Sequence, residues 1–432
     1  MSSERAATTD PASQPIPTAS TTETTTATHR PLWRNREFIL LDAGQAVSDI
    51  GTQVSHLAFP LLVLALTRSP AQAGLVGTLR AAPYFLLALP AGALVDRWNR
   101  RTVMIVCDSG RALCLGAIAA AVAFHALSLP LIYAVALGEG MLGVIYGLAS
   151  IACLPRLVPK RQLPQAYAWG AAEEGAMSLI GPPLGGALYA LGRGLPFLTD
   201  AISYVASVAS LFFIHTPLQG ERAAPREPMT REIRAGLAWL WRQPTIRMLA
   251  ILSGLINVVA PEANALLIIV LAQQQHASSS VIGLIFAGMG VGYIVGSLLV
   301  AIIRRYVPFR VVMVVSCWLY VACWGSYIFG VSNLVTLAVV SALFAVTDPI
   351  YDITQFSYRM TLIPDELQGR VNSVYRMIAR ATPPLGLALT GLLLQHFGGL
   401  STIALLGLFP LAMALLATTS RAIRAAPDHQ RP

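Results

Sequence analysis

Eight acidic side chains interrupt stretches of sequence that are otherwise apolar. They are Asp42, Asp49, Glu139, Glu173, Glu174, Glu262, Asp348 and Asp352, and three bases share such surroundings: Arg80, Arg376 and Arg380. A carboxyl group withdrawn from water binds a proton more readily, so it can load and release protons as its access to water changes. A static salt bridge, or the wall of a wet cavity, explains any single acid equally well.

The first apolar stretch carries a line of polar residues on one face. They are Asp42, Gln45, Asp49, Gln53 and His56, spaced three or four residues apart as neighbours on a helix are. Asp49 lies about 17 Å into the stretch at the rise of an α-helix. The candidate proton or substrate site comprises Asp49, Glu139, Glu262, Glu174, Asp348, Asp352, Arg80 and Arg380, of which we rank the first three highest. His56 is more simply a polar residue of a cavity wall than a proton relay.

The composition indicates that these acids lie in a lipid bilayer. Of the 432 residues, 55% are apolar and 12% are charged, and the mean hydropathy is +0.62. Soluble proteins carry about 25% charged residues, so this chain has too little polar surface to cover a soluble core. The net charge of +9 is scattered over short segments and does not gather on one face, which argues against nucleic-acid binding.

Apolar stretches long enough to cross the hydrocarbon core as helices, about 20 residues each, recur along the chain. They cover residues 38–66, 71–95, 102–125, 129–154, 165–191, 195–215, 246–272, 279–303, 309–329, 332–360, 371–396 and 399–420. We predict an all-α membrane protein with twelve transmembrane helices in two six-helix bundles, 36–216 and 246–420. We expect residues 1–35 and 421–432 to be cytoplasmic tails, the first disordered, and 217–245 to be a cytoplasmic linker with an amphipathic helix.

Basic residues mark one side of the predicted bundle. The N-terminal tail and alternate loops carry Arg34, Arg36, Arg97, Arg100, Arg101, Arg156, Lys160, Arg161, Arg222, Arg226, Arg231, Arg234, Arg304, Arg305, Arg310, Arg370, Arg421 and Arg424. The opposite loops carry Arg68 and Arg193. Because basic loops stay in the cytoplasm, we predict that both termini are cytoplasmic, in a bacterial inner membrane.

The two predicted bundles share a short sequence pattern. Leu157–Pro159 precedes a Pro-Pro-Leu-Gly segment at Pro182–Gly185, and Leu362–Pro364 precedes the same four residues at Pro383–Gly386. Duplicated halves are a known transporter architecture, in which the substrate site lies between the halves near the middle of the membrane.

The loop after the second stretch contains Gly92, Asp96, Arg97, Arg100 and Arg101. This spacing resembles the signature loop of the major facilitator superfamily, and the resemblance covers residues 33–420. It implies a loop that latches one half against the other and governs the conformational switch. Gly92 would allow close helix approach, Asp96 would face the positive N-terminus of another helix, and the arginines would form breakable ion pairs. Asn99 replaces the family's second glycine, and the matching loop near Arg304–Arg310 has no acid, so a latch there must differ.

The fifth stretch contains Gly175, Gly181, Pro182, Pro183, Gly185 and Gly186. These residues resemble the antiporter motif of proton-coupled exporters in the same superfamily, whose fifth helix faces the eighth across the interface of the halves. The eighth stretch carries Gly288, Gly292 and Gly296 at four-residue spacing, a groove suited to close backbone contact. We expect these two glycine faces to form a sliding seam, with a purely structural packing role as the alternative.

Other chemistry finds no support in the sequence. No Gly-x-x-x-x-Gly-Lys-Ser/Thr phosphate loop is present, so ATP is not expected to drive the chain unaided. The five cysteines form no metal-binding spacing, and we expect no disulfide, no metal, no other cofactor and no enzyme activity. Asp108 and Arg111, just after the basic loop, resemble a local ion pair of the exporter branch that supports that loop.

These features together predict a secondary transporter. Leu157–Pro159 with Leu163, and Leu362–Leu367 followed by Gly369–Asn372, resemble the enterobactin-exporter and macrolide-efflux-like branch of the superfamily. The resemblance implies export of a small amphiphilic molecule, such as a drug, antibiotic or siderophore, in exchange for protons by alternating access. The alternatives are an uptake symporter on the same fold, or a membrane sensor or assembly factor that does not transport. The expected partners are the transported molecule, protons and the lipid bilayer, with no nucleic acid, and the protein is expected to be a monomer.

Overall fold

The computed structural model describes residues 31–216, 218, 229–259 and 261–425, apart from a few side chains within these ranges. Residues 1–30 of the predicted N-terminal tail, most of the linker before residue 229 and residues 426–432 lie outside the described residues. Every described element is a helix, which confirms the all-α prediction.

Six long helices form the N-terminal half. They are α1 (Arg36–Thr67), α2 (Pro70–Arg97), α3 (Arg100–Ala123), α4 (Leu129–Leu157), α5 (Leu163–Leu191) and α6 (Leu195–Phe212), with 3-10 turns at Leu32–Arg34 and Lys160–Gln162. Asn35, Ser69 and Asn99 cap the first three helices through side-chain oxygens that accept backbone N–H groups. Proline occupies the first turn of α2, α4, α5 and α6, where its missing N–H removes no helical hydrogen bond.

The C-terminal half follows a short helix, α7 (Met229–Arg242), in the predicted linker. Its elements are α8 (Pro244–Val259), α9 (Glu262–Gln274), α10 (Ser279–Tyr306), α11 (Phe309–Gly330), α12 (Leu334–Leu362), α13 (Asp365–Leu406), α14 (Leu408–Thr419) and α15 (Arg421–Arg424). The predicted helix over 246–272 is broken into α8 and α9, with Pro261 immediately before the second piece. The predicted helices over 371–396 and 399–420 meet at Gly398, where the backbone leaves the helical conformation with a φ of 75° that suits glycine, so α13 comprises two helices joined at a kink.

Nine helical segments within the described residues are long and apolar enough to cross a membrane. One of them, Val371–Thr419, has 49 residues and contains the kink at Gly398. The helices α2 and α5 are not among the nine, although their 28 and 29 residues match membrane-spanning length. The structure therefore confirms a membrane protein with many helices, and the count of twelve stays a prediction.

Small residues bring α1 and α6 together within the N-terminal half. A Cβ atom at Gly44 would meet the side chain of Ser210, and one at Gly51 would meet those of Ser203 and Asp200. Larger residues at either glycine would push the two helices apart, so these contacts set the position of the polar face of α1.

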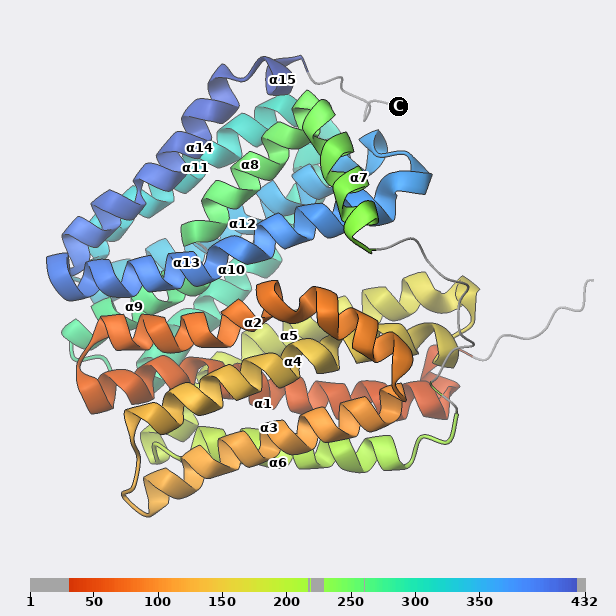
Figure 1. Cartoon of the computed structure of the whole chain (residues 1–432). Helices are drawn as coiled ribbons and strands as arrows, with labels where there is room; N and C mark the ends of the chain where they lie inside the picture. The colour runs from red at the N-terminus through yellow and green to blue at the C-terminus, as the bar shows by residue number, and fades with distance from the viewer. Residues whose placement is uncertain (1–30, 217, 219–228, 260, 426–432) are drawn as a thin grey trace, which may run out of the picture.

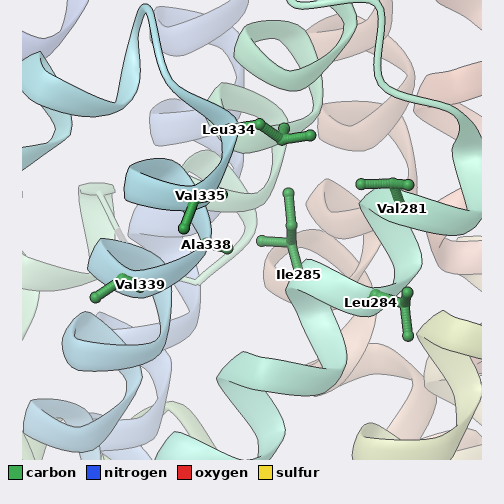
Figure 2. A pocket seen from close by; sticks show the side chains of 7 residues that line it. All are labelled: Val281, Leu284, Ile285, Leu334, Val335, Ala338 and Val339. Atoms are coloured by element: carbon green, nitrogen blue, oxygen red, sulfur yellow. The ribbon is translucent and has the colours of Figure 1, made fainter.

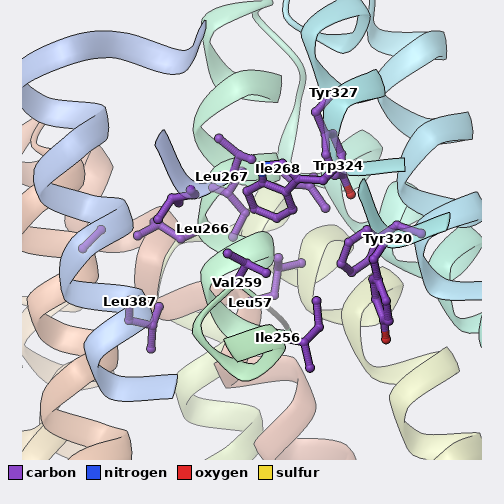
Figure 3. Packing of buried hydrophobic residues seen from close by; sticks show 14 of the residues in the cluster. Leu57, Ile256, Val259, Leu266, Leu267, Ile268, Tyr320, Trp324, Tyr327 and Leu387 are labelled. Carbon is purple, nitrogen blue, oxygen red and sulfur yellow. The ribbon is translucent and has the colours of Figure 1, made fainter. Parts of the chain in front are cut away.

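Aliphatic and aromatic side chains fill the core of the C-terminal half. Leu266, Leu267 and Ile268 of α9 pack near Trp324 and Tyr327 of α11, and all of them are almost completely buried (Figure 3). Ring pairs such as Tyr320 with Phe344, with centroids 5.3 Å apart, join α11 to α12 in an edge-to-face arrangement. This half is thus packed around aromatic rings.

The two halves meet along two pairs of helices, α2 with α13 and α5 with α10. On the first pair, Thr78 Oγ1 donates a hydrogen bond to the carbonyl of Pro384 at 3.0 Å. On the second pair, Gly186 lies against the backbone of Ser279 and Gly283. Ser279 and Gly283 lie in the first two turns of α10, and toward α7 the ribbons of the two halves diverge (Figure 1).

Candidate functional site

The largest buried charge cluster lies inside the N-terminal half and centres on Glu139 of α4. Arg80 Nε of α2 donates to Glu139 Oε2 at 2.8 Å, and Arg111 Nη2 of α3 donates to Glu139 Oε1 at 2.9 Å. Glu139 is 4% exposed, and each of its oxygens is bound by a permanently charged guanidinium. This geometry holds Glu139 as an anion. The static salt bridge therefore fits Glu139 better than a proton-carrying role.

A glycine beside Glu139 explains how α2 approaches α4 so closely. A Cβ atom at Gly140 would meet the backbone carbonyl of Arg80, so a larger residue would separate the two helices. The aromatic face of Phe59, on α1, lies 4.6 Å from the guanidinium carbon of Arg80 and supports its charge.

Arg111 connects this cluster to α6. Its Nη1 lies 3.6 Å from Asp108 Oδ1, and its guanidinium carbon lies 4.1 Å from the ring centroid of Tyr204. Asp108 also accepts a hydrogen bond of 2.6 Å from Ser207 Oγ. The predicted pair of Asp108 and Arg111 is present, but it lies buried among α3, α4 and α6 and contacts Glu139, Ser207 and Tyr204.

Asp49 lies exposed on the α1 face that the sequence singles out. It interacts electrostatically with Arg111 behind it and with Glu174 of α5, which is also exposed. Glu174 interacts in turn with Tyr293 of α10, in the other half. The chain of interactions from Asp49 to Tyr293 places this acid on the side of α1 that faces the other half.

The other polar residues of α1 contact two neighbouring helices. Trp169 Nε1 of α5 donates to Asp42 Oδ2 at 2.8 Å, and Asp42 also interacts with Glu173. Gln45 bonds to Ser150 of α4. Gln53 lies against Gly181 of α5. The polar residues on this face of α1 thus contact both α4 and α5 within the N-terminal half.

In the C-terminal half, the candidate residues are arranged around Asp348 of α12. Tyr320 donates a hydrogen bond to Asp348, which interacts with Asp352 one turn later and with Glu262 at the start of α9. Glu262 interacts with Arg380 of α13, whose guanidinium carbon lies 5.5 Å from the ring centroid of Tyr84 on α2. Neither Arg380 nor Arg376 lies within ion-pair distance of a carboxylate of the described side chains.

The predicted switch loop is tied to its own half in this structure. Arg101 donates to the carbonyls of Leu211 at 2.8 Å and Phe212 at 2.7 Å, at the end of α6. Arg100 donates to the carbonyl of Ala152 in α4 at 2.9 Å. The side chain of Asp96 lies outside the described residues. A Cβ atom at Gly92 would meet nothing within 4 Å, so the expected close helix approach at Gly92 is wrong for this state.

The glycines of the antiporter-like motif pack α5 against two helices. A Cβ atom at Gly185 would meet the carbonyl of Val54 in α1, and one at Gly186 would meet that of Ser279 in α10. In the second half, Gly386 lies in the same way against the carbonyl of Val258 in α8. The repeated Pro-Pro-Leu-Gly segment therefore makes equivalent contacts in both halves, while Gly175 has no such close neighbour.

The seam between α5 and α10 is present, but it uses other glycines of α10 than the sequence suggested. Gly283 meets the carbonyl of Pro182, and Gly290 meets Leu179. Gly292 and Gly296 face the carbonyls of Ala342 and Val346 in α12, inside the C-terminal half, and Gly288 has nothing within 4 Å. Four-residue spacing defines a helix face, but it does not say which neighbour that face meets.

A hollow of about 270 Å³ between the starts of α10 and α12 is separate from all of these charges (Figure 2). Its lining is aliphatic and comprises Val281, Leu284, Ile285, Leu334, Val335, Ala338 and Val339. Such a lining suits a hydrocarbon chain and offers no group that could orient a charged ligand.

The family model described as transmembrane secretion effector matches residues 26–430. The chain belongs to this family. It is a branch of the major facilitator superfamily, as the signature loop implied. The chain is also similar to the protein named enterobactin exporter EntS of Citrobacter koseri, with 29% identity over 360 residues, 80% of this chain and 82% of the relative. The protein of the same name in Escherichia coli O1:K1 is 28% identical over 356 residues, with the same coverage.

Solved structures show the same fold as this family member. A bacterial homologue of the human lysosomal transporter Spinster, inward-facing and unoccupied, has a TM-score of 0.72 at 13% identity, covering 91% of this chain and 98% of that one. An inward-facing bacterial homologue of the iron transporter ferroportin has a TM-score of 0.65 at 15% identity, covering 89% and 100%. The protein is therefore a multi-pass membrane transporter with the major facilitator fold.

Sequence reasoning missed part of the buried network in the N-terminal half. Asp200, Tyr204 and Ser207 of α6 are all buried, and Thr52 Oγ1 of α1 lies 2.8 Å from Tyr204 Oη. Asp200 could have been found from the sequence, because it is an acidic residue within the sixth apolar stretch. The eight candidate acids were selected on the same ground. That Arg111 joins Asp108, Glu139 and Tyr204 had no such signal, because these partners come from three different helices.

Proposed function

We propose that this transporter exports a small amphiphilic molecule from the cytoplasm in exchange for protons. The observation that carries the proposal is the position of Asp49, an exposed acid near the middle of α1 that interacts with buried Arg111 and with Glu174 near the opposite half. An acid in that place can exchange protons with whichever side the transporter opens to, and a neighbouring guanidinium competes with the proton for its negative charge.

The proposed direction rests on the basic loops and on the relatives. If the basic loops are cytoplasmic, the end of the molecule that carries α7 faces the cytoplasm. The halves would then touch on the periplasmic side, in a state from which a cytoplasmic substrate can bind. The relatives are named as enterobactin exporters, so we propose a siderophore or an amphiphilic drug as the transported molecule.

Transport then proceeds by rocking of the two halves. The seams α5–α10 and α2–α13 would open as the ends near α7 close. Asp96 and the arginines of the switch loop would latch that closed end, with Arg100 and Arg101 leaving the carbonyls that they bind here. Protonation of Asp49 would favour one of the two states, which couples the proton gradient to export.

Inverted membrane vesicles test the direction and the driving force together. Vesicles with the protein, an acidic interior and no ATP should accumulate enterobactin, and a protonophore should abolish the accumulation. Erythromycin serves as the parallel probe for the drug class, and vesicles without the protein serve as the control. Accumulation that ignores the pH gradient would overturn proton coupling, and accumulation only with an alkaline interior would identify an uptake symporter.

A further inference from the structure

Asp200 of α6 is a buried acid that the proposed mechanism does not yet use. Its side chain is 0% exposed. Oδ1 lies 3.3 Å from Ser203 Oγ, which donates to it, and the carboxyl group also bonds to the hydroxyl of Ser55 on α1. Oδ2 has no hydrogen-bond partner. A carboxyl oxygen buried without any partner is unusual in a protein interior and calls for an explanation.

Water is kept from Asp200 by the close approach of α1. A Cβ atom at Gly51 would lie 2.6 Å from Asp200 Oδ1, so the backbone of α1 closes over the carboxyl group. Gly51 therefore has two effects. It brings the Ser55 hydroxyl within bonding distance of Asp200, and it leaves no room for water around Oδ1 of the carboxyl group.

The charged groups that face Asp200 are all engaged elsewhere. Arg111 of α3 and Arg80 of α2 interact with Asp200 at longer range, but both guanidiniums bind Glu139 of α4. Asp200 itself forms no ion pair among the described residues. It receives the Ser55 hydroxyl from α1 and the Ser203 hydroxyl from its own helix, while the phenol of the neighbouring Tyr204 pairs with Thr52. An ionised carboxylate in this place would be buried without a cation in contact, which is strongly unfavourable.

We propose that Asp200 is a second proton-binding site of the transporter, located inside the N-terminal half. The carboxyl group holds a proton in the state described here, where Arg111 is bound to Glu139. When the rocking motion turns Arg111 toward α6, the guanidinium replaces the proton as the partner of Asp200. This coupling rests on the proposed proton exchange, but the proton-binding site itself does not.

Hydroxyl groups between α1 and α6 give the proton a path. Ser55 bonds to Asp200, and one turn further along α1 the hydroxyl of Thr52 lies 2.8 Å from that of Tyr204. Thr52 is one turn from Asp49, so these hydroxyls lie on α1 between the buried carboxyl group and the exposed one. In the state described here the Ser55 and Thr52 hydroxyls donate to the carbonyls of Thr52 and Ser48, so the proton would pass along this face of α1 only when the helices shift and these hydroxyls are released.

Infrared difference spectroscopy on the full chain in lipid nanodiscs tests the site without a substrate. Between acidic and alkaline pH, the carbonyl stretch of protonated carboxylic acids should be weaker in Asp200→Asn than in the wild type by one carboxyl group. Thermal unfolding should change little, because asparagine has the size and neutrality of the protonated acid. Ser203→Ala is the matched control, which should shift this band and not remove it. Superimposable spectra of wild type and Asp200→Asn would overturn the proposal, as would a large loss of thermal stability in Asp200→Asn.

The vesicle assay then tests the coupling. A gradient of about one pH unit supports about tenfold accumulation when one proton exchanges for one neutral molecule. Asp200→Asn should lose gradient-driven enterobactin accumulation and keep exchange down a concentration gradient, while Asp200→Glu should restore part of the accumulation. Wild-type accumulation by Asp200→Asn would remove Asp200 from the transport cycle. If the infrared band disappears while wild-type vesicles ignore the gradient, the proton site stands and the proposed antiport fails.

Discussion

Equivalent positions in the two halves hold different chemistry. Arg111 in α3 and Tyr320 in α11 lie equally far from the starts of their helices, and so do Glu139 in α4 and Phe344 in α12. In the N-terminal half the two side chains form an ion pair of 2.9 Å. In the C-terminal half they form an edge-to-face ring pair with centroids 5.3 Å apart.

The difference shows that the duplicated fold preserves contacts between helices without preserving their chemistry. An arginine that interacts with several acids can exchange one for another when the helices shift, and its position responds to their protonation. Aromatic rings have no such alternatives, and the ring cluster of Trp324, Tyr327 and Phe344 ties α11 to α12 whatever the pH. We propose that proton coupling depends on the N-terminal half, although the C-terminal half also holds the acids Glu262, Asp348 and Asp352 beside its aromatic core.

The largest effect is expected from removing the shared carboxylate of the N-terminal half. Glu139→Gln removes the ion-pair partner of Arg80 and leaves Arg111 with Asp108 alone at 3.6 Å, which should cost about 3–5 kcal/mol of stability. The equivalent change in the aromatic half, Phe344→Leu, keeps an apolar side chain and should cost about 1.5 kcal/mol or less. Unfolding of both variants in the same detergent measures the difference, and equal losses would contradict the contrast between the halves.

Next in size is the effect of filling the seam between the halves. Gly186→Leu places a side chain against the backbone of Ser279, so the halves cannot close at this end and transport should stop while the protein still folds. Gly292→Leu is the matched variant inside the C-terminal half, where it meets Ala342 and should lower stability by about 1–3 kcal/mol. Vesicle transport measures the loss of activity expected for Gly186→Leu, and thermal unfolding measures the loss of stability expected for Gly292→Leu. Normal transport by Gly186→Leu would show that the seam does not open and close.

A smaller effect is expected at the switch loop, which carries an acid in the first half and none in the second. Asp96→Asn should leave expression and stability near wild type but reduce transport strongly, because this acid biases a conformational equilibrium and does not build the core. Initial rates in vesicles at matched protein levels provide the measurement. Full transport by Asp96→Asn would remove the assignment of the loop as a latch.

The sequence predicted the elements better than the contacts between them. The apolar stretches placed the helices close to where they lie, because hydropathy is a local signal. The breaks near Pro261 and at Gly407 were not predicted, since neither is distinct from the many prolines and glycines that membrane helices tolerate. Helix ends are thus readable from sequence, while bends inside an apolar run depend on neighbouring helices.

The candidate site was predicted in part. The pairing of Arg80 with Glu139 joins two residues that an apolar setting had singled out. The role of Arg111 as a shared partner of Asp108 and Glu139 could not be predicted, because it depends on how α3, α4 and α6 rotate against one another. The same uncertainty about rotation led the prediction to assign Gly292 to the seam, although it faces α12.

The most direct test compares the exposed acids of the two halves in inverted vesicles with an imposed pH gradient. Asp49→Asn mimics the protonated form without a change in size, so this variant should still exchange enterobactin but fail to accumulate it when the interior is acidic. Asp352→Asn, the matched variant in the C-terminal half, should alter the concentration dependence of transport while accumulation stays driven by the gradient. If Asp49→Asn accumulates enterobactin at the wild-type level and Asp352→Asn does not, proton coupling lies in the C-terminal half and the account is wrong.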